Sequence, residues 1–296
     1  MHQDVGWDQL KWRRWAIKNK AGGRQTTFDV EYPSSWQVAF ASSGTPRFDN
    51  RKIQVWMDNA LKSSTMELKP TTKDWDWKTD GLVNPHVAPG GSIKSNIEVI
   101  SLPIKGHAYV IGGDAAHGIG LDSSAAVVYD STENSVAAWC ADPYMKPDEL
   151  AEKMLLMGWW YNRAIIAQEN NAPGNLTVHY LTESNYPWLF YRQRWDTVKN
   201  RHTNEPGFKT DMRTRELIIS YLDSLIMADG ITIQSKPILE QMLTFVYDSQ
   251  TGRADRLDGC HDDMLFSMMI AAWVAHHEQP ERPYDRTVGD ETYWDR

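Results

Sequence analysis

Short apolar runs follow one another closely between residues 107 and 142, and each ends in an acidic residue. The three runs are HAYVIGGD, SSAAVVYD and SVAAWCAD, and the polar turn STEN joins the second run to the third. Apolar runs of this length that are bounded by turn residues predict β-strands. Three such strands in succession, with short connections, predict an antiparallel meander.

A helix and a fourth strand come next. Pro147 opens a stretch, DELAEKMLLMGWWYN, whose apolar residues recur at helical spacing, and proline is favoured in the first turn of a helix. AIIAQEN then predicts a strand, and its continuous apolar character is typical of a buried, parallel one. Further helices are predicted at RTRELIISYLDSLIMADG, KPILEQMLTFVYD and HDDMLFSMMIAAWVAHH, the last of which is apolar almost all round and therefore buried. This order of elements is that of an RNase H-like fold, so we expect an α/β domain over residues 106–278, with a mixed sheet flanked by helices.

The chain outside this domain has a different character. Residues 1–65 begin with a basic, tryptophan-rich stretch that predicts an amphipathic helix, and a second helix is expected from Asp49 to about Leu61. This part is therefore expected to be a small helical N-terminal segment. Residues 66–105 are rich in Pro, Gly, Thr and Asn and carry weak strand signals, which predicts a connector with room for a small hairpin. Residues 279–296 form a polar tail that we expect to be loosely ordered.

Composition narrows the class of protein. The 296 residues include 31 Lys and Arg against 39 Asp and Glu, a formal net charge of -8, and 41% of them are hydrophobic, which is typical of a globular chain. Two cysteines, Cys140 and Cys260, cannot build a disulfide framework or a zinc site, which points to a reducing compartment. The sequence shows neither a membrane span of about 20 apolar residues nor a secretory signal. The acidic balance excludes a histone-like positive coat, but it allows a DNA enzyme whose basic residues cluster on one face.

Acidic residues lie at the ends of two apolar strands and at the start of the last buried helix. Asp114 ends YVIGGD, Glu169 ends AIIAQE, and Asp262 and Asp263 begin the final helix. We expect the strand ends to put Asp114 and Glu169 on the same rim of the sheet, and a helix packed on the sheet to bring Asp263 to them. Such a cluster of carboxylates is costly unless a cation compensates it. Two Mg²⁺ or Mn²⁺ ions about 4 Å apart would do so, and they would clamp the attacking and leaving oxygens of phosphodiester cleavage.

Each acid also has a purely structural interpretation. Asp114 follows two glycines and suits a turn, and Glu169 precedes two asparagines and suits a solvated strand end. Asp262 suits a helix N-cap. Asp122 is a fourth candidate, because a hairpin of the first two strands, which the loop AAHGIGL permits, would return it close to Asp114. Asp122 is equally suited to a turn.

The stretch from Tyr191 to Arg215 is strongly basic, and aromatic residues are interleaved with its positive charges. A mobile basic loop beside an acidic metal site would bind the DNA backbone, because phosphate contacts carry most of the affinity for DNA. The alternative is a solvated polar loop and helix face. The candidate DNA-binding residues are Arg192, Arg194, Lys199, Arg201, Lys209 and Arg213.

Two other kinds of hydrolase have no support in the sequence. There is no G-x-x-x-x-G-K-[ST] phosphate loop, since GGSIKS at 90–95 lacks the Gly-Lys pair, and there is no G-x-S-x-G nucleophile motif. We therefore expect neither ATP hydrolysis nor covalent nucleophilic hydrolysis.

Four separated motifs, occurring in order, resemble the nuclease half of the large terminase subunit of tailed bacteriophages. They are YVIGGDAAHGIGLDSSAAVV, IIAQENNAPG, the TRELI helix and DGCHDDMLFSMMIAA. Together they cover about residues 106–276. Upstream, FDVEYPSSWQVAFASSG resembles the end of that family's ATPase domain, so the resemblance implies that residues 1–65 are the remnant or tail of an ATPase-like domain.

The resemblance implies a two-metal-ion endonuclease that cuts concatemeric viral DNA during genome packaging, in the cytoplasm of an infected bacterial host. By motif position, Asp114 would bridge both metal ions, Glu169 would be the second acid and Asp263 the third. Asp262 would share that last role, and Asp122 would be an auxiliary acid. The implied partners are double-stranded DNA, the portal protein, the small terminase subunit and a separate or missing ATPase motor, with no membrane.

The chain departs from this family in lacking the Walker motifs of the ATPase, of which only the tail is present. Packaging by this chain alone is therefore not implied, whereas DNA cleavage is. Two alternatives stay open. An RNase H-like junction resolvase or hybrid RNase would use the same acids, and a non-catalytic packaging assembly module would use the polar tail and the tryptophan-rich N-terminus as interfaces.

Overall fold

The computed structural model describes residues 6–20, 32, 45–70, 85–90, 96–196, 200–248, 251–257 and 259–277. Lys199, the polar tail 279–296 and all of FDVEYPSSWQVAFASSG except Tyr32 lie outside the described residues. The chain forms two compact units. One, called the first unit here, joins Met1–Leu61 to Ile233–Leu265, and the other, called the sheet unit, joins Lys62–Thr232 to Phe266–Arg296. These bounds differ from the expected division at residues 65, 105 and 278.

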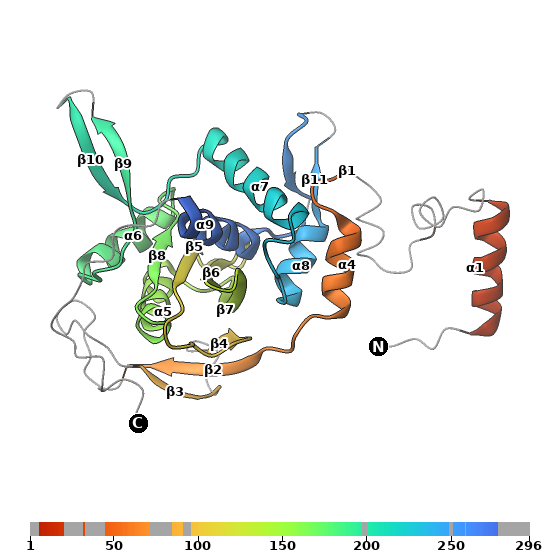
Figure 1. Ribbon diagram of the computed structural model, residues 1–296, viewed down its shortest axis with the longest axis horizontal. Helices are drawn as coiled ribbons and strands as arrows, with labels where there is room; N and C mark the ends of the chain where they lie inside the picture. Colours follow the sequence, from red (N-terminus) through yellow and green to blue (C-terminus); the bar gives the residue numbers. More distant parts are fainter. Residues whose placement is uncertain are drawn as a thin grey trace. The chain divides into compact units, whose positions relative to one another are not determined.

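The sheet unit is built on a seven-stranded sheet with the strand order β3-β2-β4-β7-β6-β5-β8 (Figure 1). β5 (Tyr109–Asp114), β6 (Ser124–Asp130) and β7 (Ser135–Asp142) pair in antiparallel fashion. β8 (Ile165–Gln168) follows the crossover helix α5 (Pro147–Trp160) and lies parallel to β5. The expected meander, crossover helix and parallel strand are confirmed, and the fold is the mixed α/β, RNase H-like one.

Three more strands extend the sheet beyond β7. β2 (Ser64–Lys69), β3 (His86–Pro89) and β4 (Asn96–Val99) are each antiparallel to their neighbours. The antiparallel pair of β2 and β3 agrees with the small hairpin expected in the connector, and β4 adds a further strand of the sheet in the same stretch. Ile97 and Val99 are buried in the core and lie two positions apart, with a glutamate between them. A strand signal of only two apolar residues is easily lost among turn-forming neighbours.

Helix α5 and helix α9 (Asp263–His277) cover opposite faces of the sheet. A Cβ added to Gly112 would lie 1.8 Å from the carbonyl oxygen of Ser267 in α9, whereas one added to Gly113 would lie 2.6 Å from Cε of Met154 in α5. Successive residues of a strand face opposite sides, so each glycine lets a different helix approach the backbone of β5. The expectation that α9 is buried is confirmed. Although α9 is apolar, no helix among the described residues has both the length and the apolar character needed to cross a membrane.

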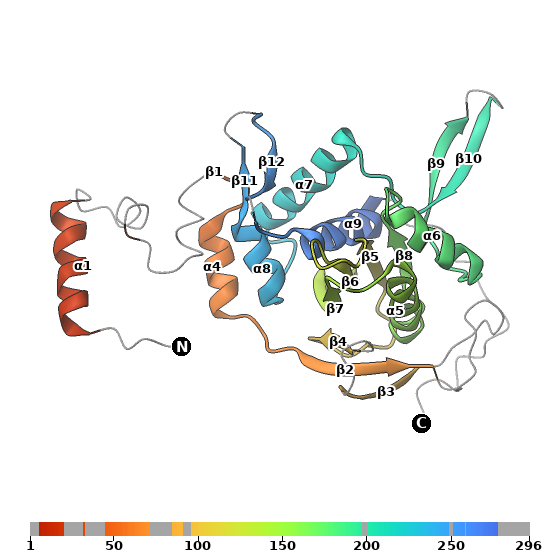
Figure 2. The same cartoon turned by 180° about the vertical axis from the view of Figure 1, so that it is seen from behind.

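The region after β8 contains a hairpin that the sequence does not predict. α6 (Gly174–Glu183) is followed by β9 (Tyr191–Asp196), β10 (Arg201–Pro206) and α7 (Met212–Met227). β9 and β10 pair with each other alone, and both views show them extending away from the sheet beside α6 (Figures 1 and 2). Where a loop is expected, the structure therefore has these two strands. β9 and β10 are polar and lack the apolar alternation typical of strands, because cross-strand pairs rather than burial stabilise them.

The first unit contains both helices that the sequence predicts near the N-terminus. They are α1 (Trp7–Asn19) and α4 (Asn50–Asp58). Asp49 caps α4, since its Oδ1 accepts a hydrogen bond from the backbone N–H of Arg51 at 2.9 Å. α4 packs against α8 (Lys236–Leu243) from the second segment of the unit.

A small sheet joins the same two segments. Its order is β1 (Thr45–Pro46), β11 (Phe245–Tyr247) and β12 (Ala254–Arg256), all antiparallel. The helix expected over KPILEQMLTFVYD therefore ends earlier, at Leu243, and its last part is a strand. Aromatic and β-branched residues such as those of β11 favour strands, and pairing with β1 and β12 provides the partners.

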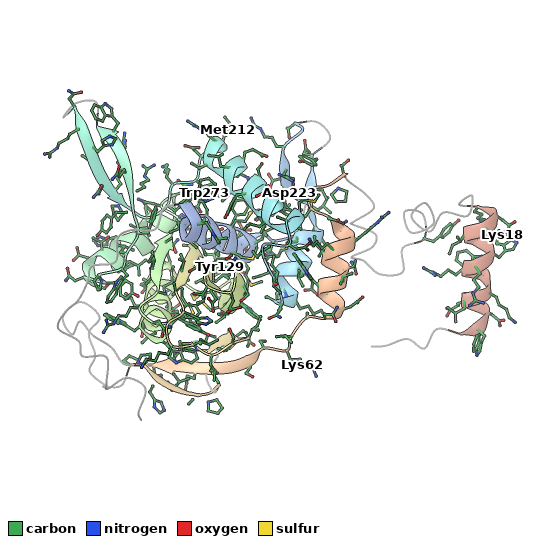
Figure 3. All side chains as sticks on the ribbon, in the orientation of Figure 1. Lys18, Lys62, Tyr129, Met212, Asp223 and Trp273 are labelled. Atoms are coloured by element: carbon green, nitrogen blue, oxygen red, sulfur yellow. The ribbon has the colours of Figure 1, made fainter. Side chains whose placement is uncertain are left out.

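Aromatic side chains tie the C-terminal end of α9 to β6 and α7. Trp273 stacks on His277 with 4.0 Å between ring centroids, and Tyr221 of α7 packs edge-on against His277. The hydroxyl of Tyr129 in β6 lies 3.2 Å from Nε2 of His276. Figure 3 labels Tyr129 on the sheet and Trp273 on the helix above it. The helix is thus fixed on the sheet by polar and aromatic contacts as well as by apolar packing.

Candidate metal centre

Two of the expected acids lie at the same end of the sheet, on neighbouring strands. The parallel register pairs Gly113 of β5 with Gln168 of β8, and the N–H of Glu169 donates to the carbonyl oxygen of Gly113 at 2.8 Å. Asp114 and Glu169 are the next residues of these two strands. Adjacent strands are about 4.8 Å apart, so the structure brings both acids to one rim. Both are partly buried.

The strand alternation also fixes the face on which the acids stand. Gly112 faces α9, and Asp114 is two residues further along β5, so it is on the α9 side. The side chain of Gln168 is buried on the other side, where it lies against the position of Gly113. Glu169, the next residue, is therefore directed to the α9 side as well. Ser267 of α9 donates from Oγ to the carbonyl oxygen of Ala125, the register partner of Asp114, at 3.2 Å.

Glu169 is held by the residues that follow it. Asn171 Nδ2 donates to Oε1 of Glu169 at 3.0 Å and to the carbonyl oxygen of Thr210 at 2.7 Å. The N–H of Asn170 donates to the carbonyl oxygen of Phe208 at 2.6 Å. The sequence shows these asparagines only as turn residues, because their partners lie almost 40 positions away along the chain.

Asp122 lies in the loop that joins β5 to β6. The hairpin expected for these strands is confirmed, and Gly118 and Gly120 both adopt positive φ in its loop. Asp122 is exposed there, three residues before Ala125, whose register partner is Asp114. Its role as an auxiliary acid stays a prediction.

Asp262 and Asp263 belong to the first unit and have different surroundings. Oδ1 of Asp262 accepts a hydrogen bond from Nη1 of Arg256 at 2.9 Å. Asp263 is the first residue of α9, its side chain is 6% exposed, and its Oδ2 lies 3.6 Å from Nδ1 of His261. The positive end of a helix favours an ionised carboxylate in its first turn, which suits Asp263.

The donor set fits a hard divalent cation in kind. Asp114 and Glu169 offer carboxylate oxygens, which Mg²⁺ and Mn²⁺ prefer, on one rim. Within the described part of the chain, no group of three His, Cys, Asp or Glu side chains is arranged so that it could hold a metal ion. The assignment of Asp114, Glu169, Asp262, Asp263 and Asp122 as ligands therefore stays a prediction.

The candidate basic residues differ in whether an acidic side chain pairs with them. Glu205 of β10 binds Arg192 and Arg194 across the hairpin, the second through Nη1 at 2.7 Å. These hydrogen bonds, that of Arg194 first and that of Arg192 next, lower the pKa of the Glu205 carboxyl below its usual value. On the same hairpin, Trp195 packs edge-on against His202 with 5.0 Å between centroids. The exposed basic residues among the candidates are Arg194, Arg201, Lys209 and Arg213.

No family model matches the chain, and no curated protein sequence matches it either. Solved structures do match. The large terminase nuclease from thermophilic phage G20c with bound cobalt is 18% identical, with a TM-score of 0.48 over 60% of this chain and 86% of that chain. The same nuclease with bound magnesium is 17% identical, with a TM-score of 0.48 and the same coverage. The large terminase nuclease domain of Thermus phage P74-26 is 16% identical, with a TM-score of 0.43 over 64% of this chain and 90% of that chain.

Proposed function

We propose that this protein is a divalent-metal-dependent DNA endonuclease, the DNA-cutting part of a phage large terminase. The parallel register of β5 and β8 carries the proposal, because it sets Asp114 and Glu169 side by side at one end of the sheet. Two partly buried carboxylate residues so placed are costly unless a cation relieves their repulsion. The four ordered sequence motifs support the same conclusion.

Asp263 is the third acid in this proposal. The assignment rests on its place in the motif DGCHDDMLFSMMIAA and at the first residue of α9. Oδ1 of Asp262 instead pairs with Nη1 of Arg256 at 2.9 Å. We therefore assign Asp263 the main role and Asp262 a supporting one.

Asp114, Glu169 and Asp263 would hold two Mg²⁺ or Mn²⁺ ions. Such ions supply an activated water and stabilise the leaving oxygen of a phosphodiester. The contribution of the chain is to fix the carboxylates on rigid strand ends and a helix start, so that their geometry changes little during the reaction. Asp122 would assist from its exposed loop.

Double-stranded DNA is the proposed substrate, held by the β9–β10 hairpin and the residues that follow it. Arg201, Lys209 and Arg213 are exposed and suited to phosphate contacts. Trp195 and His202 add an exposed aromatic pair on the same hairpin. In this proposal the enzyme acts on concatemeric viral DNA in the infected bacterial host, with the portal protein, the small terminase subunit and an ATPase motor as partners.

Cleavage of supercoiled plasmid in Mn²⁺ or Mg²⁺, with an EDTA control, tests the proposal. Asp114→Asn is expected to abolish cutting and to leave the unfolding midpoint close to that of the wild type, because asparagine keeps the shape but removes the charge that the cations need. Asp148→Asn is the matched control, since Asp148 is an exposed acid in the first turn of α5. It is expected to cut like the wild type.

If Asp114→Asn cleaves DNA at the wild-type rate, Asp114 is not a ligand of the metal centre. A preference for branched DNA would favour a junction resolvase. A folded wild-type protein that cuts nothing in either metal would favour an assembly module.

A further inference from the structure

The side chain of Asn171 links the carboxylate of Glu169 to the chain just before α7. Its Nδ2 donates to Oε1 of Glu169 at 3.0 Å and to the carbonyl oxygen of Thr210 at 2.7 Å. An amide nitrogen carries two hydrogens, so both bonds form together. The opposite amide orientation would set an oxygen against two acceptors. The two partners therefore fix which way the amide points.

The carbonyl of Thr210 is a firm anchor because it lies within the capping structure of α7. Oδ1 of Asp211 accepts hydrogen bonds from the N–H groups of Arg213 and Thr214, each at 2.9 Å. Oγ1 of Thr214 donates to the carbonyl oxygen of Lys209 at 2.9 Å. The residues on both sides of Thr210 are thus tied to the first turn of the helix.

Other contacts already hold the backbone of this turn without Asn171. The N–H of Phe208 donates to the carbonyl oxygen of Gln168 at 2.7 Å, and the N–H of Asn170 donates back to Phe208 at 2.6 Å. Nδ2 of Asn170 donates to the carbonyl oxygen of Pro206 at 2.9 Å. The fold of the turn therefore rests chiefly on these backbone hydrogen bonds, whereas the side chain of Asn171 contacts the carboxylate itself.

We propose that Asn171 is a positioning residue for the metal centre, a role that rests on the proposed function. It would hold Glu169 in one rotamer through Oε1 and leave the other carboxylate oxygen, Oε2, available to a cation. A carboxylate that is oriented beforehand loses less freedom when it binds a metal ion. Outer partners of metal ligands commonly contribute 10- to 100-fold to metal affinity, about the effect expected here.

Titration of the full-length protein with Mn²⁺, followed by the electron paramagnetic resonance signal of the free ion, tests this role. Asn171→Ala is expected to bind Mn²⁺ about tenfold more weakly than the wild type. Asn170→Ala is the matched control, because it removes a contact of the same turn but none to the carboxylate. It is expected to bind Mn²⁺ like the wild type, and Glu169→Gln marks the loss of the ligand.

Rescue of cleavage by added Mn²⁺ is a readout that a smaller folded fraction would not imitate. In low Mn²⁺, Asn171→Ala is expected to lower kcat with little change of KM for DNA, and a tenfold increase in Mn²⁺ should restore most of kcat, because mass action compensates weaker binding.

Three results would overturn the role of Asn171. Wild-type affinity in Asn171→Ala, beside weakened binding in Glu169→Gln, would do so and leave the proposed function standing. Equal weakening in Asn170→Ala would show general support of the turn instead. A wild-type protein that binds no Mn²⁺ would overturn the proposed function and the positioning role together.

Discussion

Gly112 and Gly113 are adjacent residues, but they differ in how well each would tolerate a side chain. A Cβ at Gly112 would lie 1.8 Å from the backbone oxygen of Ser267 and 2.9 Å from the backbone nitrogen of Ala271, so the whole of α9 would have to move. At Gly113 the nearest atoms, 2.2 to 2.9 Å away, are the ends of the Gln168 and Met154 side chains, which can rotate.

We therefore expect Gly112→Ala to lower the free energy of unfolding by at least about 3 kcal/mol and Gly113→Ala by about 1 kcal/mol. Urea unfolding of the two variants measures the difference. Equal midpoints would mean that α9 does not press on β5 as closely as the distances indicate.

At the same scale, the sequence reveals which acids end strands but not how they are held. The placement of Asp114 and Glu169 on one rim follows from two apolar runs and a crossover helix, and the register of β5 and β8 agrees with it. The role of Asn171 depends on Thr210, and no local pattern connects the two. A contact between two side chains that are far apart in sequence leaves no periodic pattern from which it could be predicted.

Among the elements, the strongly periodic or continuously apolar ones could be predicted, and the polar or very short ones could not. β5 to β8, α5 and α9 bury most of their residues, so their sequences are apolar at the buried positions. The β9–β10 hairpin buries little, and its stability comes from pairs such as Trp195 with His202. The sequence of this hairpin therefore lacks the apolar pattern from which a strand could be predicted.

The hairpin and the residues after it carry a prediction about salt. Changing Arg201 and Lys209 to Gln is expected to weaken DNA binding and to reduce the slope of log affinity against log salt by about 1 per lost phosphate contact. Arg192→Gln should change the slope less, because Glu205 already pairs with that guanidinium. Fluorescence anisotropy with labelled duplex DNA over a salt series measures both. An unchanged slope in the double variant would exclude these two residues from the DNA interface.

For the whole molecule, buried tyrosines predict a loss of stability in alkali. Burial is the main cause that raises the pKa of Tyr109 from 10.0 to about 12, and burial also raises the pKa of Tyr129. The unfolded chain releases these protons near pH 10 while the folded chain keeps them. Stability is therefore full below about pH 10 and falls as the pH rises toward 12.

We expect the free energy of unfolding to drop by about 2 kcal/mol for Tyr109 across that window. Urea midpoints at pH 8, 10 and 11 measure the drop, and Tyr109→Phe should show a shallower one. If the stability of Tyr109→Phe falls as steeply with pH as that of the wild type, groups other than Tyr109 cause the loss of stability in alkali.

The two units also differ in when their parts leave the ribosome. Thr45 pairs with Tyr247 in the first unit, so β1 is synthesised long before its partner exists. All seven strands of the sheet precede residue 169, but α9, which covers one of its faces, begins only at Asp263. Domains ordinarily fold from the N-terminus as they are made, whereas here both units wait for residues 233–277. A translation pause in that stretch would leave one face of the sheet uncovered and β1 without its partner on the same nascent chain.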